Sequence, residues 1–253
     1  MFDTGEVREL ELLGRRVSPA SLAGEHLLPL PPALAKLTPH GGLQRGSVVA
    51  VQGPGATTLA LGLIAGPSAA GSWVVGVGTP EVGLVAAAGL GVDLERVVVV
   101  DAPPRAQWAT VVAAVADAFD VVLVRHRSPV RPGDARRLTA RVRERGGVLV
   151  QLPGRSRAWP DAADLTFTLS DPVWRGVSAD APGAGRLGAR LVQVTVDGRR
   201  AAALGRSASL WLPGPDGEIE LARPVEEFPG LGHRNDGDTG QRTGVVELEL
   251  VAG

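Results

Sequence analysis

The sequence predicts an α/β domain with a mainly parallel central sheet that continues into an antiparallel extension. Three observations lead to this prediction. Between residues 43 and 152, short apolar runs alternate with helix-length segments, which is typical of βαβ units. The apolar runs are continuous rather than alternating, as in strands that are buried on both faces. After residue 160 the helix-like segments stop, and short strand-like runs follow one another across turn residues.

The expected elements follow a regular order. Strands are predicted at 47–52, 73–77, 97–100, 121–124 and 148–152, and helices at 57–65, 82–90, 106–119 and 134–145. Further strands are predicted at 165–169, 191–196, 201–204, 210–212 and 219–221. Among these, 191–196 and 201–204 form a hairpin across Asp197-Gly198, because Asp-Gly is a strong turn pair.

The two ends of the chain differ from this core. Residues 4–17 read as a short amphipathic helix, and the Pro-rich stretch Leu28–Pro32 reads as a connector that breaks regular structure. Residues 216–253 carry a net charge of −6, and residues 230–243 read as a disordered linker before an alternating, strand-like segment at 245–251. The predicted organisation is an N-terminal helix and connector (1–40), a core domain (41–222) and an acidic flexible tail (223–253).

Composition excludes several classes of function. The 253 residues suit one domain with appendages, and the net charge of −1 does not indicate a general polyanion binder. Cysteine is absent, which excludes disulfides, thiol catalysis and Cys-ligated metals. The four histidines lack metal-ligand spacing, and no nucleophile-elbow motif occurs. We therefore expect no metal, no cofactor and no catalytic residue. With neither a long apolar run nor a signal-peptide layout, a cytoplasmic protein is predicted.

The most informative segment is a degenerate phosphate-binding loop. It runs from the strand at 47–52 into Gly53-Pro54-Gly55-Ala56-Thr57-Thr58, which opens a helix. A working P-loop reads G-x-x-x-x-G-K-[ST] and uses its backbone N–H groups and its lysine to hold phosphates. Here the turn is about three residues too short. Ala56 stands where the lysine should be, and the only lysine of the chain, Lys36, lies elsewhere. An ordinary strand–turn–helix of a βαβ unit explains the same pattern.

The surrounding residues resemble the RecA family over roughly residues 34–222. The resemblance rests on Gly41-Gly42-Leu43, Gly53-Pro54, Thr57–Leu61 and Leu90–Leu94. It implies a RecA-like fold. In RecA-like ATPases the strand matching Val121–Val124 ends in an aspartate that helps to hold Mg²⁺, whereas here Arg125-His126 follows, and a cation there is unfavourable for a metal ion. Glu81 lies near the position of the RecA catalytic glutamate, but without the lysine and the aspartate it reads as a helix-start residue.

A narrower resemblance is to the ImuA family, in the actinobacterial form called ImuA′. Three stretches carry it: Leu30–Ala35 running into Gly41–Leu43, Leu165–Gly176 and Ser209–Gly217. The resemblance implies a catalytically inactive adaptor in SOS-induced mutagenesis and translesion synthesis. Its implied partners are an ImuB-like Y-family protein and, through that protein, an error-prone DnaE-type polymerase, with nucleoid association after damage. Two alternatives stay open, an atypical ATPase or recombinase that binds DNA, and a RecA-like cell-division inhibitor.

The candidate binding surface is rich in arginine. Residues 125–145 carry a net charge of +6, and on a helix Arg137, Arg141 and Arg145 form one stripe. Such a stripe suits DNA phosphates or an acidic partner, but a solvated helix in a chain with arginine-biased composition looks the same. The predicted surface for a partner or weak DNA contact comprises Arg125, Arg127, Arg131, Arg137, Arg141, Arg145, Arg155, Arg157, Trp159, Val246, Leu248 and Leu250.

Overall fold

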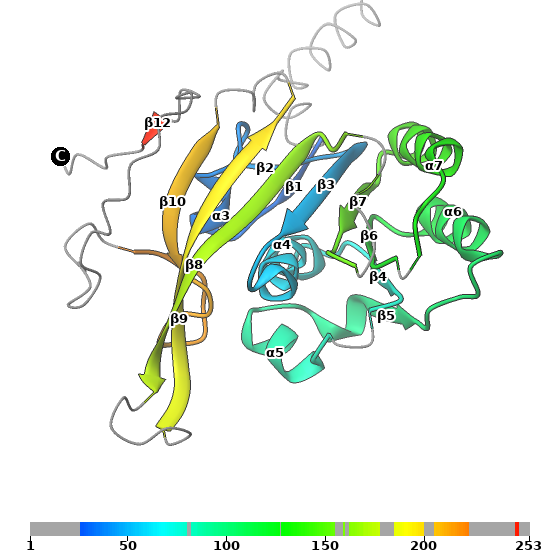
Figure 1. The fold of residues 1–253 in the computed structure, drawn as a ribbon. Helices are drawn as coiled ribbons and strands as arrows, with labels where there is room; N and C mark the ends of the chain where they lie inside the picture. Colours follow the sequence, from blue (N-terminus) through cyan, green and yellow to red (C-terminus); the bar gives the residue numbers. More distant parts are fainter. Residues whose placement is uncertain are drawn as a thin grey trace, which may run out of the picture.

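The protein is described here from a computed structural model, which places residues 26–79, 82–126, 128–154, 159, 162–177, 185–199, 205–222 and 246–247. One long, twisted sheet runs through the molecule, with helices packed on it (Figure 1). Its strand order is β11-β10-β9-β8-β3-β7-β6-β4-β5, and the six strands from β8 to β5 are parallel to one another. The predicted α/β class with a mainly parallel sheet is confirmed.

The parallel half of the sheet follows the predicted order closely. Its strands are β3 (Ser47–Gln52), β4 (Val74–Val77), β5 (Val97–Val100), β6 (Val121–Val124), β7 (Val148–Gln151) and β8 (Leu165–Val177). The helices between them are α4 (Ala56–Ala69), α5 (Leu84–Gly89), α6 (Trp108–Ala118) and α7 (Pro132–Arg145), with a 3-10 turn, η1, at Leu94–Arg96. The continuous apolar runs correctly indicated two-sided burial for β4, β6 and β7, in which every residue is buried. For β5 the prediction of two-sided burial is wrong, because β5 is an edge strand and its central valines are exposed.

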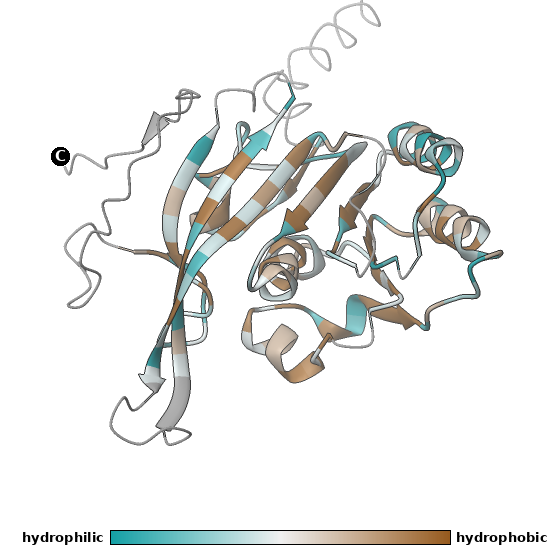
Figure 2. Ribbon diagram, in the orientation of Figure 1, coloured by the Kyte–Doolittle hydropathy of each residue, from teal (hydrophilic) through white to brown (hydrophobic). Residues whose placement is uncertain are grey.

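Two hydrophobic layers hold the helices on the sheet. Alternate residues of each strand point to opposite faces, so Val121 joins the layer under α4 while its neighbour Val122 joins the layer under α6 and α7. On α7, Ala135, Leu138 and Val142 are buried, as the sequence pattern predicts, and the polar outer face of this helix is visible in Figure 2. Because helices cover the two faces of the sheet, the loops that follow the strands lie along its carboxyl edge.

The antiparallel extension differs from the prediction in its turns. It consists of β8, β9 (Gly185–Gly198), β10 (Arg206–Trp211) and β11 (Glu220–Leu221). The predicted turn at Asp197-Gly198 is wrong, because both residues pair with the start of β8, and the strand that pairs with β9 next is β10. The predicted strand at 201–204 lies outside the described residues. The predicted pairing of 210–212 with 219–221 is confirmed by the ladder between β10 and β11.

The Pro-rich stretch near the N-terminus is structured, which contradicts its prediction as a break in regular structure. Leu27–Pro29 forms β1, which pairs with β2 (Gly42–Gln44), and Pro32–Ala35 forms the single-turn helix α3 with proline at its start. Leu28, Leu34 and Leu37 are fully buried in the main core. The packed domain therefore begins before the predicted boundary at residue 41.

The predicted helix at 4–17 and the predicted linker at 230–243 lie outside the described residues. Of the predicted C-terminal strand, the described residues Val246 and Glu247 form β12, which pairs in parallel with β10. Within the part of the chain that the structure describes, no helix is long and apolar enough to span a bilayer.

Candidate functional site

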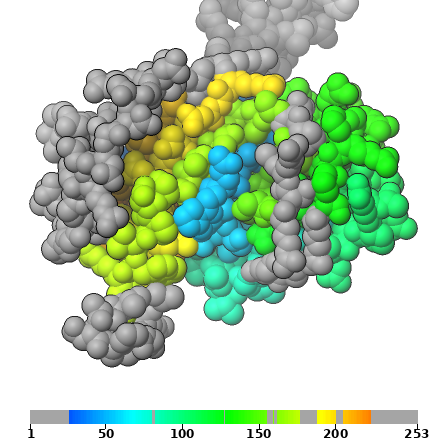
Figure 3. Space-filling model, in the orientation of Figure 1, coloured from blue at the N-terminus to red at the C-terminus, as the bar shows by residue number. Residues whose placement is uncertain are grey.

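The degenerate loop is a tight turn between β3 and α4, held against β8. Gly53 and Gly55 have positive φ angles of +95° and +94°, a conformation that glycine adopts without strain. A Cβ atom on Gly53 would collide with the backbone carbonyl of Leu169. Gly55 caps the N-terminus of α4, and no side chain donates or accepts a capping hydrogen bond there. In Figure 3 the surface of α4 lies directly beside the yellow-green β8–β9 strands.

A buried arginine packs against this turn. The guanidinium of Arg190, on β9, lies so close to Gly55 that a Cβ atom there would stand 2.6 Å from its Cζ atom. Arg190 is only 7% exposed, its Nε donates to the carbonyl of Leu212 at 2.8 Å, and it lies 5.0 Å from the ring centroid of Trp174. Its Nη2 has no hydrogen-bond partner among the described residues. Burial lowers the pKa of Arg190 below its ordinary value, because the charged form loses its hydration.

A second arginine reaches the first turn of α4. Arg125 follows β6 directly, at the position where the RecA resemblance leads one to expect a metal-binding acid, and its Nη2 donates to the Thr57 hydroxyl at 2.9 Å. Thr57 is the residue that would hold Mg²⁺ in a working P-loop. The arrangement places cations at both sides of the helix N-terminus, which itself carries a partial positive charge. Such a site is electrostatically hostile to a divalent cation.

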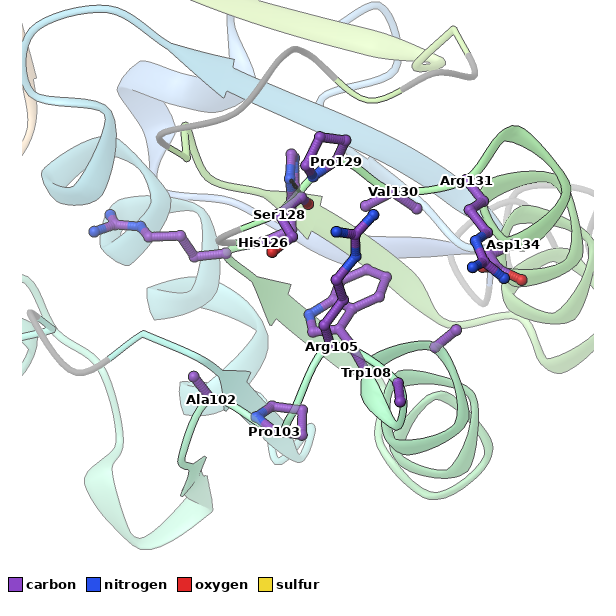
Figure 4. Close-up of a pocket in the computed structure, with 13 residues that line it drawn as sticks. Ala102, Pro103, Arg105, Trp108, His126, Ser128, Pro129, Val130, Arg131 and Asp134 are labelled. Atoms are coloured by element: carbon purple, nitrogen blue, oxygen red, sulfur yellow. Dashed lines mark hydrogen bonds between the residues drawn. The ribbon is translucent and has the colours of Figure 1, made fainter.

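A charged concavity opens at the carboxyl ends of β5 and β6. It has a volume of about 660 Å³ and is bounded by the loop after β5, the loop after β6 and the first turns of α6 and α7 (Figure 4). Its described lining residues are Ala102, Pro103, Arg105, Ala106, Trp108, Ala109, Arg125, His126, Ser128, Pro129, Val130, Arg131 and Asp134. In open α/β sheets, ligands bind outside the carboxyl ends of the strands, so the position is typical of a functional site.

Three aromatic rings support the wall of this pocket. Trp108, His126 and Trp159 lie with ring centroids 6.1–6.4 Å from one another in tilted and edge-on arrangements. His126 Nδ1 lies 3.2 Å from the carbonyl of Ser128. Trp159, which the sequence analysis includes in the predicted binding surface, is only 8% exposed, so its ring packs inside the domain. The indole nitrogens of Trp108 and Trp159 are buried without an acceptor among the described residues.

The arginine stripe of α7 is largely paired within the molecule. Arg141 and Arg145 both donate to Asp117 on α6, and Arg137 donates to Asp134 one turn earlier on its own helix. The hydrogen bond from Arg141 is the main reason why the pKa of Asp117 lies below its ordinary value, and the same contact raises the pKa of Arg141. The surface is therefore less positive than a count of arginines indicates.

The remaining predicted site residues are divided between described and undescribed parts. Arg131 lines the pocket together with Arg125, whereas Trp159 supports it from behind. Arg127, Arg155, Arg157, Leu248, Leu250 and the helix-start candidate Glu81 lie outside the described residues. The backbone of Val246 pairs with β10, far along the sheet from β6.

Two residues of these sites were missed by sequence reasoning. Arg190 gives no local signal, because it is brought to Gly55 by the register of β9 rather than by a motif. Arg105 lies in Pro-rich sequence after β5, and its position beside a presumed strand end was the one signal that could have indicated it. No group of three or more acidic or histidine side chains that could hold a metal occurs among the residues placed by the structure.

Comparisons with known proteins agree with this architecture. The family model of the MT3502 N-terminal domain matches residues 36–161. The uncharacterised protein Rv3395c of Mycobacterium tuberculosis is 31% identical over 195 residues, which cover 76% of this chain and 89% of that protein. The crystal structure of the RadB recombinase superposes with a TM-score of 0.53 at 18% identity, covering 76% of this chain and 97% of the recombinase, which confirms the RecA-like fold. The chain belongs to the MT3502 N-terminal domain family, together with Rv3395c.

Proposed function

We propose that this chain is a catalytically inactive RecA-like adaptor in damage-induced translesion DNA synthesis. It binds an ImuB-like protein and, through that protein, an error-prone DnaE-type polymerase. The observation that best supports this proposal is the contact between Arg125 and Thr57. In RecA-like ATPases these two positions serve the metal ion of the bound nucleotide, whereas here a guanidinium fills the space between them.

The short turn supports the same proposal. Ala56 offers no charge to a phosphate, and the Gly53–Gly55 turn packs against Leu169 and Arg190 instead of wrapping a ligand. ATP turnover needs its metal and its lysine to neutralise the charge that develops on the phosphates. A fold that keeps the RecA-like sheet but lacks both groups is suited to holding partners rather than to hydrolysis.

Exposed apolar side chains also favour a protein-binding role. Val98 and Val99 on the edge strand β5 are 36% and 47% exposed, and Val85 on the neighbouring α5 is 89% exposed. Edge strands of monomeric proteins are commonly protected by charged residues, and β5 consists of four valines. A surface of this kind is typical of proteins that work in complexes.

The proposal is tested by affinity capture of the tagged full chain from DNA-damaged cells, followed by mass spectrometry. Joint recovery of an ImuB-like protein and a DnaE-type polymerase is the expected result. A second arm uses a chain shortened by residues 222–253, which lacks Val246, Leu248 and Leu250 of the predicted surface and should therefore capture less partner. Recovery of a division protein alone would replace the proposal with the division-inhibitor alternative. Mg·ATP hydrolysis that disappears in Thr57→Ala would replace it with the ATPase alternative.

A further inference from the structure

The pocket at the carboxyl ends of β5 and β6 is electropositive from several independent sources. Arg105 and Arg131 are exposed at its rim, and neither makes an ion pair or a side-chain hydrogen bond with another described residue. Arg125 forms part of the same wall. The one carboxylate among the described lining residues, Asp134, is already held by Arg137 at 2.8 Å. Arg105 and Arg131 therefore present two cationic groups that the carboxylate of the described lining does not neutralise.

Two helix N-termini add to this field. Helix α6 begins at Trp108 and α7 begins after Arg131, and both of these residues line the pocket. Neither helix has a side-chain cap, so the first backbone N–H groups of α6 are left for another acceptor. In α7, Pro132 has no N–H and the Asp134 N–H donates to the Arg131 carbonyl, so α7 contributes through its dipole alone. Each helix end carries a partial charge of about +0.5, which favours an anion close to it.

A buried hydrogen-bond donor at the same place also lacks an acceptor. The Trp108 indole N–H has no partner among the described residues, and the ring is held by its edge-on contacts with His126 and Trp159. Buried indole N–H groups in proteins are normally satisfied, so the unpaired Trp108 nitrogen is an unusual feature of a residue that lines this pocket. Figure 4 shows Trp108 and Arg105 on one side of the pocket, with Ser128, Pro129 and Val130 opposite.

We propose that this pocket binds a phosphate-bearing small molecule without a metal ion. Arg105 and Arg131 hold the phosphate, and Arg125 and the two helix ends stabilise its negative charge. Arginine suits this task because its planar fork of donors matches phosphate oxygens. The volume of about 660 Å³ lies in the range of small-molecule sites, and Pro103, Pro129 and Val130 offer an apolar wall for the rest of the ligand.

This inference does not depend on the adaptor proposal. A ligand here would lie at the ends of β5 and β6, beside the Arg125–Thr57 contact rather than in the Gly53–Gly55 turn. It needs no hydrolysis and no partner protein. Arg125 nevertheless links the pocket to α4, because it lines the pocket and donates to Thr57. A bound phosphate and the Thr57 hydroxyl would therefore compete for the same guanidinium.

The test is isothermal titration of the full chain with ADP, with inorganic pyrophosphate and with a short oligothymidylate, all in EDTA. The double variant R105Q/R131Q removes both rim charges, and R136Q is the matched control. Arg136 is an exposed arginine of α7 that does not line the pocket and makes no ion pair with another described residue. Because all three side chains are exposed, each variant should keep the wild-type urea midpoint, which is checked first.

We expect saturable, metal-independent binding of ADP or pyrophosphate. R105Q/R131Q should weaken it at least about tenfold, since two charged hydrogen-bonding partners are lost, while R136Q should leave it unchanged. Binding of the oligothymidylate alone would overturn the small-molecule assignment in favour of nucleic acid. No saturable binding, or an equal loss in R136Q, would overturn the site itself. The titration uses the purified chain alone, whereas the adaptor test measures partner capture from cells, so failure of either experiment leaves the other proposal standing.

Discussion

Arg125 donates a hydrogen bond to Thr57 across 2.9 Å, so that a guanidinium joins the end of β6 to the first turn of α4. The two residues come from the elements that hold a metal and a nucleotide between them in RecA-like ATPases. Here the space is closed by a contact within the chain. The connection between the central sheet and α4 is therefore made without a nucleotide, whereas in a working ATPase it depends on the bound nucleotide.

The first prediction concerns this hydrogen bond. Thr57→Val keeps the branched shape of the side chain but removes the acceptor of the Arg125 guanidinium. We expect the free energy of unfolding to fall by about 1 kcal/mol, because a partly buried charged donor loses one of its hydrogen-bond acceptors. Urea denaturation of the full chain measures the change. Thr58→Val is the control, since Thr58 is equally part-buried in the same turn and makes no side-chain hydrogen bond with another described residue. Equal destabilisation in both variants would contradict the prediction.

The second prediction concerns the contact between Gly55 and Arg190. Gly55 and Gly71 share a φ angle of +94°, but a Cβ atom at Gly71 would meet nothing within 4 Å, whereas at Gly55 it would meet the buried guanidinium. Gly71→Ala should therefore lower the free energy of unfolding only by the backbone strain, about 1 kcal/mol. Gly55→Ala should add a steric loss of about 1–3 kcal/mol, because Arg190 is packed and must move.

A double-mutant cycle with Arg190→Met checks the cause of that difference. If the clash with the guanidinium is responsible, Gly55→Ala in the Arg190→Met background should destabilise no more than Gly71→Ala does. An undiminished difference in that background would mean that the Gly53–Gly55 turn itself, rather than Arg190, rejects the side chain.

The third prediction concerns ATP. Ala56→Lys restores the missing lysine, and Ala56→Lys with Arg125→Asp restores the expected acid as well. Neither variant should hydrolyse Mg·ATP, because the turn between Gly53 and Gly55 is still too short to wrap a β-phosphate. Phosphate release over several hours measures turnover. Hydrolysis by the double variant would show that the two side chains, rather than the length of the turn, are the missing parts.

Local patterns were sufficient to predict the parallel half of the fold. The apolar run of β6 indicated a buried strand, and the apolar spacing of α7 indicated the buried face formed by Ala135, Leu138 and Val142. The valine run of β5 correctly indicated a strand, but this strand is a partly exposed edge. The Asp197-Gly198 pair gave a wrong prediction, because its turn propensity was outweighed by pairing with β8. β8 lies outside the short stretch of sequence from which a turn is predicted.

The sites were predictable only in part, for the same physical reason. The degenerate turn is a local motif and was found directly. Arg190 reaches Gly55 through the register of a strand far along the chain, and the pairing of Arg141 with Asp117 depends on how α6 packs beside α7. Contacts of this kind are set by tertiary packing, so the sequence showed the arginines but not the groups that neutralise them.

The last prediction uses the pH dependence of the Asp117 contact. The pKa of Asp117 is lower in the folded chain than the value of about 3.9 for an unperturbed aspartate, chiefly because Arg141 donates to it. Its stabilisation is therefore complete at neutral pH and declines below about pH 4, where the unfolded chain takes up the proton first, and it is lost below the folded pKa. Asp117→Asn should lower the urea midpoint slightly at pH 7 and by less at pH 3.5. Asp101→Asn, which alters an exposed aspartate without an ion pair to another described residue, should show no such trend. If the difference between wild type and Asp117→Asn stayed constant from pH 7 to pH 3.5, the pairing of α7 with α6 would not depend on the charge of Asp117.

The same variant frees Arg141 and Arg145, so if the α7 stripe is a surface for nucleic acid, Asp117→Asn should bind oligothymidylate more tightly than wild type at low salt.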